Sequence, residues 1–287
     1  MTRPVRAIEG AGVGLRHAFA SELAESAREP DWLEVIVENW TYDASPTEIW
    51  LLDRCVERWP ATPHSFNLSL GGPAALDREL LAHIRRFCRR TRAPFWSDHI
   101  SFSSTRAAVL NDLLPLPRTY ESVRHVARRI RRAQELVEAP LIVENVCHYV
   151  EPPGCLLGEA EFVTAVLEES DCGLLLDITN VLLNAMNFGY DALSFLKQLP
   201  SERVRQIHVA GYSRDALGLD THRGPVGEDV WALYEQYLRH LRRAVPTSVE
   251  WDTDIPAWPV VADELDRVRL GTERALGRSL HATEVVS

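Results

Sequence analysis

The chain has 287 residues, of which 46% are hydrophobic and 25% are charged, as in an ordinary soluble globular protein. Its formal net charge of −10 argues against general nucleic-acid binding, which needs a basic face to neutralise phosphates. Its five cysteines show no Cys-x-x-Cys spacing, which argues against a thiolate metal site and a disulfide framework. No apolar run approaches membrane-spanning length, so we expect a cytoplasmic protein that binds neither nucleic acid nor membrane.

Short apolar runs alternate with helical patterns along the whole chain, which is typical of βα units and a parallel sheet. The expected strands are Gly12–Arg16, Trp32–Glu38, Pro63–Leu68, Phe95–Ile100, Pro140–Asn145, Gly173–Ile178, Val204–Val209 and Thr247–Trp251. The expected helices are His17–Arg28, Pro46–Arg58, Ala74–Arg90, Pro117–Val137, Glu159–Glu169, Tyr190–Gln198, Glu228–Arg242 and Val260–Leu276.

Eight strands and eight helices in a chain of this length predict an α/β protein of the (β/α)8 TIM-barrel class. No Gly-x-Gly-x-x-Gly or Walker motif supports a nucleotide-binding open sheet instead. We expect one domain over residues 1–287, with a core at about 11–276 and a short tail at 277–287.

Polar residues stand where most of the expected strands end. In a TIM barrel the carboxyl ends of the strands form the face that carries the active site. Ionisable side chains are costly there unless they are paired or bind a metal. The residues concerned are Glu38, Asn39, His64, Asp98, His99, Glu144, Asn145, Asp177, Asn180, His208, Glu250 and Asp252, together with Asp220 and His222 in the loop after the seventh strand.

Asp220 and His222 are two residues apart, so on an extended segment they point to the same side and can reach one metal ion. A solvated surface loop would also account for this pair taken alone. Together with His64, His99, Glu144, Asp177, Asn180, His208 and Glu250, however, they exceed the two histidines and one carboxylate of a mononuclear site. Nine donors of this kind can hold two or three metals, with Glu144 and Glu250 as bridges. These ligand types do not distinguish iron, manganese and zinc from one another. They therefore do not decide between redox and hydrolytic chemistry.

The same residues lie in a series of motifs: HSFNLSLGG, SDHISFS, LNDLLPLP, VENV, GLLLDITNV, IHVAGY, DTHRGPVGEDVWALY and VEWDTDIP. In this order they closely resemble the multinuclear non-haem iron-dependent oxidative enzymes, a family that includes the methanobactin-biosynthesis oxidase. The resemblance extends from GVGLR near the N-terminus to IPAWPVVADEL and therefore covers nearly the whole chain.

The resemblance implies a xylose-isomerase-like barrel that holds two or three iron ions, with a mixed-valent Fe(II)/Fe(III) pair that activates O2 as co-substrate. Members modify ribosomally made precursor peptides, most often at cysteine, and many act with a partner protein that presents the peptide's leader. Carried over by motif, the metal ligands are His64, His99, Glu144, Asp177, Asn180, His208, Asp220, His222 and Glu250. Asp98, Asn145, His148 and Asp252 are implied as neighbours that orient these ligands.

The chain departs from the family pattern at two positions. Tyr212 stands where many members have the last histidine of His-x-Ala-Gly-His, and Asp98 stands where many have a glutamate. Tyr212 is therefore a candidate for altered acid–base behaviour at the mouth of the site. The alternatives are a metal-dependent hydrolase of the phosphodiesterase or apurinic-endonuclease type, an isomerase on the same barrel, and a non-catalytic scaffold that binds a partner.

Overall fold

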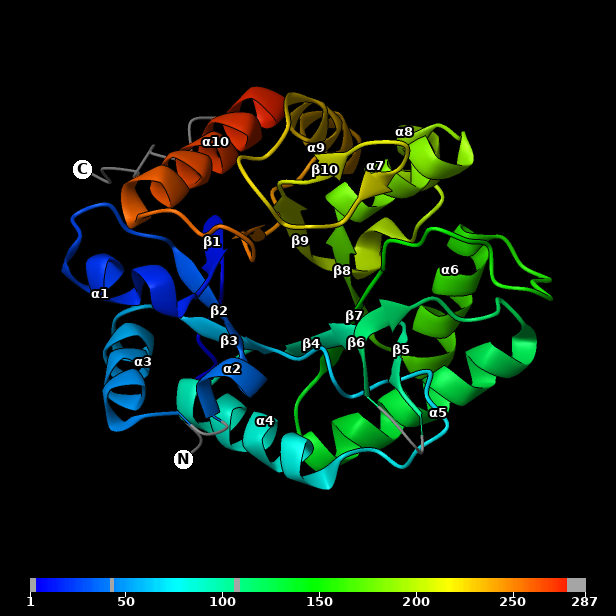
Figure 1. Ribbon diagram of the computed structural model, residues 1–287, viewed down its shortest axis with the longest axis horizontal. Helices are drawn as coiled ribbons and strands as arrows, with labels where there is room; N and C mark the ends of the chain where they lie inside the picture. The colour runs from blue at the N-terminus through cyan, green and yellow to red at the C-terminus, as the bar shows by residue number, and fades with distance from the viewer. Residues whose placement is uncertain (1–3, 42–43, 106–108, 278–287) are drawn as a thin grey trace, which may run out of the picture.

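The computed structural model describes residues 4–41, 44–105 and 109–277. Eight parallel strands close into a barrel in the order β1-β12-β9-β8-β7-β4-β3-β2, surrounded by helices (Figure 1). The barrel strands are β1 (Ala11–Gly14), β2 (Trp32–Ile36), β3 (Ala61–His64), β4 (Trp96–His99), β7 (Leu141–Glu144), β8 (Gly173–Asp177), β9 (Val204–Ala210) and β12 (Thr247–Glu250). The expected TIM barrel is therefore confirmed.

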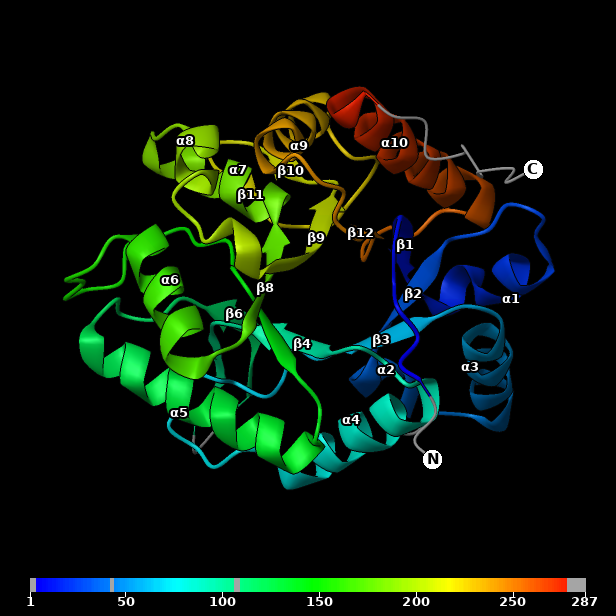
Figure 2. The ribbon, with the colours of Figure 1, turned by 180° about the vertical axis from the view of Figure 1, so that it is seen from behind.

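The helices pack outside the strands, and the last of them lies beside the first (Figure 2). They are α1 (His17–Glu25), α2 (Val37–Thr41), α3 (Pro46–Arg58), α4 (Arg78–Thr91), α5 (Tyr120–Val137), α6 (Glu159–Ser170), α7 (Ile178–Phe188), α8 (Ala192–Leu196), α9 (Glu228–Leu241) and α10 (Trp258–Leu276), with a 3-10 turn η1 (Ser201–Arg203). Side-chain caps determine where several of these helices begin. Ser45 and Glu48 form a capping box on α3, and Asp77 caps α4.

The strands are buried on both faces, as parallel strands in a barrel must be. β2, β7 and β12 are buried along their whole length. Because the outer face packs against helices, apolar residues such as Leu33, Trp96 and Val143 are completely buried. The inner face is different: towards the carboxyl ends it carries acids and histidines, so the polar residues cluster in the barrel interior.

Several expected element boundaries near the site were wrong. The second strand was expected to reach Glu38, but it ends at Ile36 and α2 begins at once. The third was expected to reach Leu68 but ends at His64. The sixth strand is followed directly by α7, which was not expected. The next helix was expected at Tyr190–Gln198, where only the short α8 forms. The apolar run of α7 continues that of β8, so periodicity alone does not separate them.

Two small antiparallel sheets were also not expected. β5 (Phe102–Ser104) pairs with β6 (Val109–Leu114) after β4, and β10 (Ser213–Arg214) pairs with β11 (Gly218–Leu219) after β9. Both lie in loops at the carboxyl ends of barrel strands, so they build up the face that carries the polar residues. The expected tail lies outside the described residues from position 278 onward.

Candidate metal centre

Three groups of metal-ligating side chains adjoin one another in the barrel. In each group the ligand atoms lie within 4.8 Å of one another. The groups are His64, His99 and Glu144; Glu144, Asp177, His208 and Glu250; and His222, Glu250 and Asp252. Because Glu144 belongs to the first two groups and Glu250 to the last two, the groups form one continuous centre.

Strand register brings these residues together. His99 on β4 is the register partner of Glu144 on β7, and Asp177 on β8 is the partner of His208 on β9. His64 ends β3 and pairs with Ser97. Since all of these strands run in the same direction, their last residues reach the same level of the barrel.

The first group joins β3, β4 and β7. Glu144 Oε2 lies 3.1 Å from His99 Nε2 and 3.7 Å from His64 Nε2. The other ring nitrogen of His64, Nδ1, lies 2.8 Å from Ser97 Oγ. Ser97 therefore orients the His64 ring so that Nε2 faces Glu144.

The second group lies across the barrel. His208 Nδ1 is 3.2 Å from Glu144 Oε1 and 3.1 Å from Glu250 Oε2. Asp177 is fully buried, and its Oδ1 accepts a hydrogen bond from the Asn180 backbone N–H at 2.6 Å. One oxygen of Asp177 thus caps α7, and the other remains for a ligand.

Asn145 and Asn180 brace this group. The Asn145 side chain bonds both backbone groups of Asp177, at 3.0 Å and 2.9 Å, and so ties the end of β7 to the end of β8. Asn180 Nδ2 donates to the Asn145 carbonyl at 3.3 Å. These bonds hold the Asn180 side chain in place, while its Oδ1 has no hydrogen-bond partner among the residues that the structure describes.

The third group depends on a loop. His222 has a positive φ of 44°, which costs a non-glycine residue conformational energy. Its backbone carbonyl accepts from Asp252 N at 2.9 Å, and its Nδ1 lies 2.7 Å from Asp252 Oδ2. Its other nitrogen, Nε2, lies 2.8 Å from Asp220 Oδ1. The predicted juxtaposition of Asp220 and His222 is therefore present in the structure.

Arg16 closes the centre on the β1 side. Its Nε donates to Asp252 Oδ1 at 2.8 Å, and its Nη2 lies 3.8 Å from Glu250 Oε1. Burial opposes ionisation of Asp252, but Arg16 and His222 hold the pKa of that carboxyl well below its usual range. Arg16 already neutralises Asp252, so a metal is better placed at the Asp220 side of His222 than at the Asp252 side.

The carboxylates around His208 and His99 raise the pKa of both histidines. Burial opposes protonation of His208, but Glu250, Glu34 and Glu144 together raise its pKa well above the usual value. In the same way, Glu144 outweighs burial and raises the pKa of His99 to about 9. In the metal-free protein, protons on these rings therefore supply the positive charge that the acids need.

Protons on the histidines do not neutralise all of the buried acids. Burial and the nearby Glu144 raise the pKa of Asp177 well above its usual range. Among the described residues, six predicted ligands have a buried side-chain atom without a hydrogen bond: His99 Nδ1, Glu144 Oε2, Asp177 Oδ2, Asn180 Oδ1, Asp220 Oδ1 and His222 Nε2. Asp220 Oδ1 and His222 Nε2 face each other at 2.8 Å, and Glu144 Oε2 faces His99 Nε2 at 3.1 Å. Buried polar atoms are normally satisfied, so Asp177 Oδ2 and Asn180 Oδ1, together with the facing donors of Asp220 and His222, fit bound metal ions.

A cavity of about 770 Å³ leads to the centre, which is within the size range of small-molecule sites. His64, His99, Asp220, His222 and Glu250 line its inner end. Its outer part is lined by His17, Asn39, Phe66, Asn67, Asp112 and Ile255. β6 contributes Asp112, so one of the unexpected hairpins forms part of the wall.

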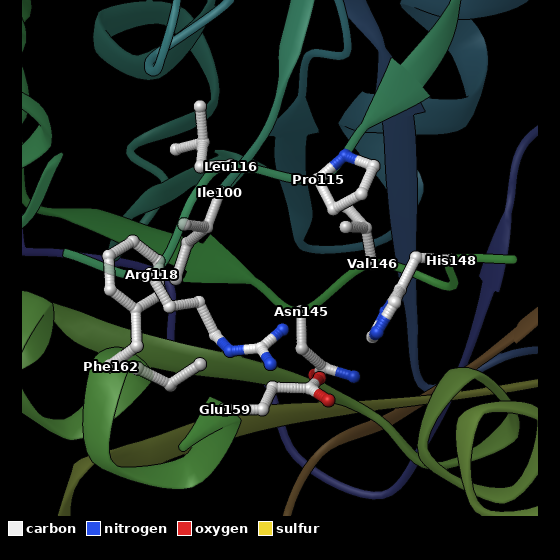
Figure 3. Close-up of a pocket in the computed structure, with 10 residues that line it drawn as sticks. Ile100, Pro115, Leu116, Arg118, Asn145, Val146, His148, Glu159 and Phe162 are labelled. Carbon is white, nitrogen blue, oxygen red and sulfur yellow. The ribbon is translucent and has the colours of Figure 1, made fainter. Parts of the chain in front are cut away.

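Not all of the predicted residues meet in this cavity. His148 faces neighbouring cavities, stacks on Phe188 with ring centroids 4.6 Å apart, and lies 3.6 Å from Glu151. Figure 3 shows it with Asn145, Arg118 and Glu159 around a small cavity of about 30 Å³ behind the end of β7. Thus the structure places His148 beside the centre but outside its donor groups.

Tyr212 and Asp98 also lie outside the donor groups. The Tyr212 hydroxyl donates to Asp229, in the first turn of α9, at 2.5 Å. Asp98 is buried beneath the loop after β3, where it accepts hydrogen bonds from His99 N and Leu68 N. Burial raises the pKa of Asp98 to about 7. Its contacts brace the backbone at His99.

Two residues of the centre were not singled out from the sequence. Arg16 was included only as the end of a strand, and Glu34 lies within β2, where its carboxylate meets His208. A detectable signal exists for Glu34, because an acid interrupts the apolar run WLEVI of a strand that is buried on both faces.

A match to a protein-family model shows which family the chain belongs to. The model for RiPP precursor modification enzymes MbnB/TglH/ChrH, which act on ribosomally made peptides, matches residues 10–272. The chain belongs to this family. As an MbnB/TglH/ChrH family member, it has the barrel and the candidate metal centre within the matched range, which confirms the family identified from its motifs.

Curated relatives extend over almost the full chain. A UPF0276 protein of Pseudomonas aeruginosa is 42% identical over 266 residues, which cover 91% of this chain and 92% of the relative. A UPF0276 protein of Acinetobacter baylyi is 38% identical over 263 residues, which cover 91% and 90%. These relatives support the family but add no activity.

Solved structures support the fold. An L-ribulose 3-epimerase superposes with a TM-score of 0.61 at 14% identity, covering 94% of this chain and 96% of that one. A xylose isomerase domain protein from Alicyclobacillus acidocaldarius gives 0.55 at 16% identity, covering 94% and 99%. At such low identity the likeness concerns the xylose-isomerase-like barrel alone. In the described part of the chain, every helix is too short or too polar to cross a membrane.

Proposed function

We propose that this family member is a multinuclear iron, O2-dependent oxidase that modifies a ribosomally made precursor peptide at cysteine, by C–H or C–C oxidation. The observation that carries the proposal is the sharing of Glu144 and Glu250 between adjoining donor groups. A site for one ion needs no shared carboxylates, whereas two or three neighbouring ions need bridges between them.

The ligand assignment follows from which atoms face one another. His64 Nε2, His99 Nε2 and Glu144 would hold the first ion. Glu144, Asp177, His208 and Glu250 would hold the second. Asn180, Asp220 and His222, which line one cavity, would hold the third, with Glu250 shared between the second and the third.

The donor chemistry favours iron over softer metals. The three groups contain imidazole and carboxylate but no thiolate, and such ligands suit non-haem iron, manganese and zinc rather than copper(I). Iron ions bound here would supply the redox chemistry with O2 that oxidation of a peptide requires.

The protein's own residues prepare the site in two ways. Ser97, Asp252 and Asn145 fix the orientation of His64, His222 and Asp177 through hydrogen bonds. The cavity places the centre at the bottom of a chamber of about 770 Å³, large enough for a side chain with its adjoining backbone. A substrate cysteine could therefore reach the centre while the rest of the peptide closes the mouth against water.

We propose two partners. The family description supports a precursor peptide as substrate, and the family resemblance suggests a leader-binding protein that delivers it. The formal net charge of −10 agrees with a peptide or protein partner rather than with a nucleic acid.

The decisive experiment is metal analysis with Mössbauer and EPR spectroscopy on protein purified without oxygen. The proposal expects two or more irons per chain and a mixed-valent signal that changes when a cysteine-containing precursor peptide is added. Stoichiometric zinc, with no peptide oxidation after iron reconstitution, would reject it in favour of a metal-dependent hydrolase or isomerase.

The ligand assignment has its own test. His64→Ala, Glu144→Ala and His222→Ala should each lower the iron content, because each removes a donor from a different part of the centre. His240→Ala is the matched control, because His240 is exposed in the last turn of α9. Equal iron content in all four variants would show that the ligands lie elsewhere.

A further inference from the structure

Glu34 is an acid buried deep in the barrel. It is the central residue of β2 and is only 1% exposed. A buried carboxylate is costly unless its oxygens are paired. Its partners should therefore reveal why an acid occupies a strand that otherwise consists of apolar residues.

The partners of Glu34 both lie on β9. His208 Nε2 is 2.9 Å from Glu34 Oε1 and 3.0 Å from Glu34 Oε2, and Gln206 Nε2 donates to Glu34 Oε2. Gln206 and His208 are two residues apart on one strand, so they point to the same side. All three side chains are buried.

The opposite edge of the His208 ring faces the donor groups. Its Nδ1 lies 3.1 Å from Glu250 Oε2 and 3.2 Å from Glu144 Oε1. The His208 ring therefore lies between Glu34 on its Nε2 side and the candidate metal centre on its Nδ1 side. Glu34 fixes the orientation of the ring from that side. Gln206 Nε2 donates to Glu34 and also lies 2.9 Å from His208 Nε2.

We propose that Glu34 is a positioning residue for the metal centre: it accepts the Nε2 proton of His208 and thereby presents Nδ1 to the metal. This inference rests on the proposed function, since it requires that a metal binds. A carboxylate that accepts the remote N–H of a ligating histidine fixes the ring and makes it a stronger donor, and its loss costs about 10–100-fold in metal affinity. Glu34 itself touches neither the metal nor the substrate.

Glu34→Gln is the variant of choice because the neighbouring groups can adapt to it. The glutamine carbonyl can still accept from His208 Nε2, but as a weaker acceptor than a carboxylate. Gln206 Oε1 has no hydrogen-bond partner within the described residues, so it can turn to accept from the new amide. The fold should therefore survive while the basicity of the His208 ligand falls.

The test is a titration of metal-free protein with Fe(II) without oxygen, in competition with a chelator, and a parallel titration with Co(II), whose visible bands report the ligand field. Glu34→Gln should weaken the affinity for at least one ion by about 10–100-fold and shift the Co(II) bands. Glu264→Gln is the matched control, because Glu264 is an acid on α10 that is also only 5% exposed. It should leave both readouts unchanged.

The outcomes separate this inference from the function it rests on. Wild-type protein that binds no metal would reject the proposed function. Wild-type protein that binds metal, with Glu34→Gln equal to it in affinity and Co(II) spectrum, would reject only the role of Glu34. Equal losses in Glu34→Gln and Glu264→Gln would also reject that role, because they indicate a general effect on the fold.

A measurement on wild-type protein covers the case in which the variant does not fold. In Zn(II)-loaded protein with ¹⁵N-labelled histidine, NMR should show His208 protonated at Nε2 and bound to metal through Nδ1. Metal bound through Nε2 would overturn the inference.

Discussion

Arg16 and Asp252 join the first and last strands of the barrel: Arg16 Nε donates to Asp252 Oδ1 at 2.8 Å, although the two residues are 236 positions apart. Asp252 also contacts His222, because its other oxygen, Oδ2, lies 2.7 Å from His222 Nδ1. Closure of the barrel thus fixes the histidine that carries the most strained backbone of the centre.

The first prediction concerns this chain of contacts. Asp252→Asn should weaken metal binding at the Asp220 and His222 end by about 10–100-fold, because an amide holds the His222 N–H less strongly than a carboxylate. Iron bound per chain at equilibrium, measured against a chelator, is the readout. Arg16→Lys should act in the same direction, since one ammonium cannot contact both Asp252 and Glu250 as the guanidinium does.

Arg28→Lys provides the control for Arg16→Lys. Arg28 also pairs with two acids, Asp263 and Asp266, but on the exposed surface of α10. Its replacement should leave the metal content at the wild-type level. Wild-type affinity in Asp252→Asn would mean that His222 needs no support from Asp252.

A second prediction separates metal binding from folding stability. Without metal, Asp177 is a buried acid crowded by Glu144, and burial raises its pKa well above the usual range. Asp177→Asn removes the acid but can still cap α7 through its oxygen. It should therefore raise the free energy of unfolding of the metal-free protein by about 1–2 kcal/mol and lower its metal content.

Asp77→Asn is the control for Asp177→Asn. Asp77 also caps a helix, α4, through its side chain but is exposed, so its change should alter neither stability nor metal content appreciably. Urea denaturation of the metal-free proteins measures the effect. A less stable Asp177→Asn protein would contradict the view that this acid is retained for a metal.

The third prediction is a pH dependence from Glu159, which lies in the small cavity of Figure 3. Burial raises its pKa to about 7 from a usual 4.5. The native state then binds this proton more tightly than the unfolded state. The stability that this provides is complete below pH 4.5 and is lost as the pH rises through about 7.

Relative to Glu159→Gln, wild-type protein should therefore lose about 2–3 kcal/mol of unfolding free energy between pH 5 and pH 8. The comparison is made by urea denaturation of the metal-free proteins at both pH values. Glu161→Gln, an exposed neighbour in the same helical turn, should follow the wild-type dependence. Parallel curves for wild type and Glu159→Gln would show that Glu159 titrates near its usual value.

A fourth prediction concerns the loop that carries His222. A methyl group at Gly211 would lie 2.2 Å from the Gly224 carbonyl oxygen and 2.4 Å from that of Arg223. Gly211→Ala must therefore push this loop away from β9, at a cost of about 1–3 kcal/mol, and should weaken iron binding. At Gly158, the N-cap of α6, a methyl group meets no described atom within 4 Å, so Gly158→Ala should leave the iron content unchanged and cost no more than the loss of a glycine cap. Equal behaviour of the two variants would argue against close packing at Gly211.

Much of this architecture was predictable because local patterns encode it. Parallel strands are short apolar runs, and their polar last residues identified the strand ends that carry His99, Glu144 and Asp177. The helix α7 was missed because its apolar residues continue those of β8. The hairpin of β5 and β6 was missed because its short strands have no pattern that distinguishes them from a loop.

Residues that act from inside a strand or across the barrel were harder to find. Glu34 stands in the middle of a strand rather than at its end, so a search of strand ends passes over it. Arg16 is the last residue of an expected strand, yet its contact with Asp252 exists only because β1 and β12 are neighbours in the closed sheet. Conversely, His148 lies close to Glu144 in sequence but faces a different cavity.

The sequence by itself determined the class of fold and the supply of donors, because hydrophobic periodicity and strand-end chemistry are local properties. Only the tertiary structure decided which donors share an ion-sized space and which ring nitrogen faces it. Those relations depend on strand order, register and side-chain rotamers. Thus Glu34 and His208, 174 positions apart, meet because the closed barrel directs both side chains into one interior.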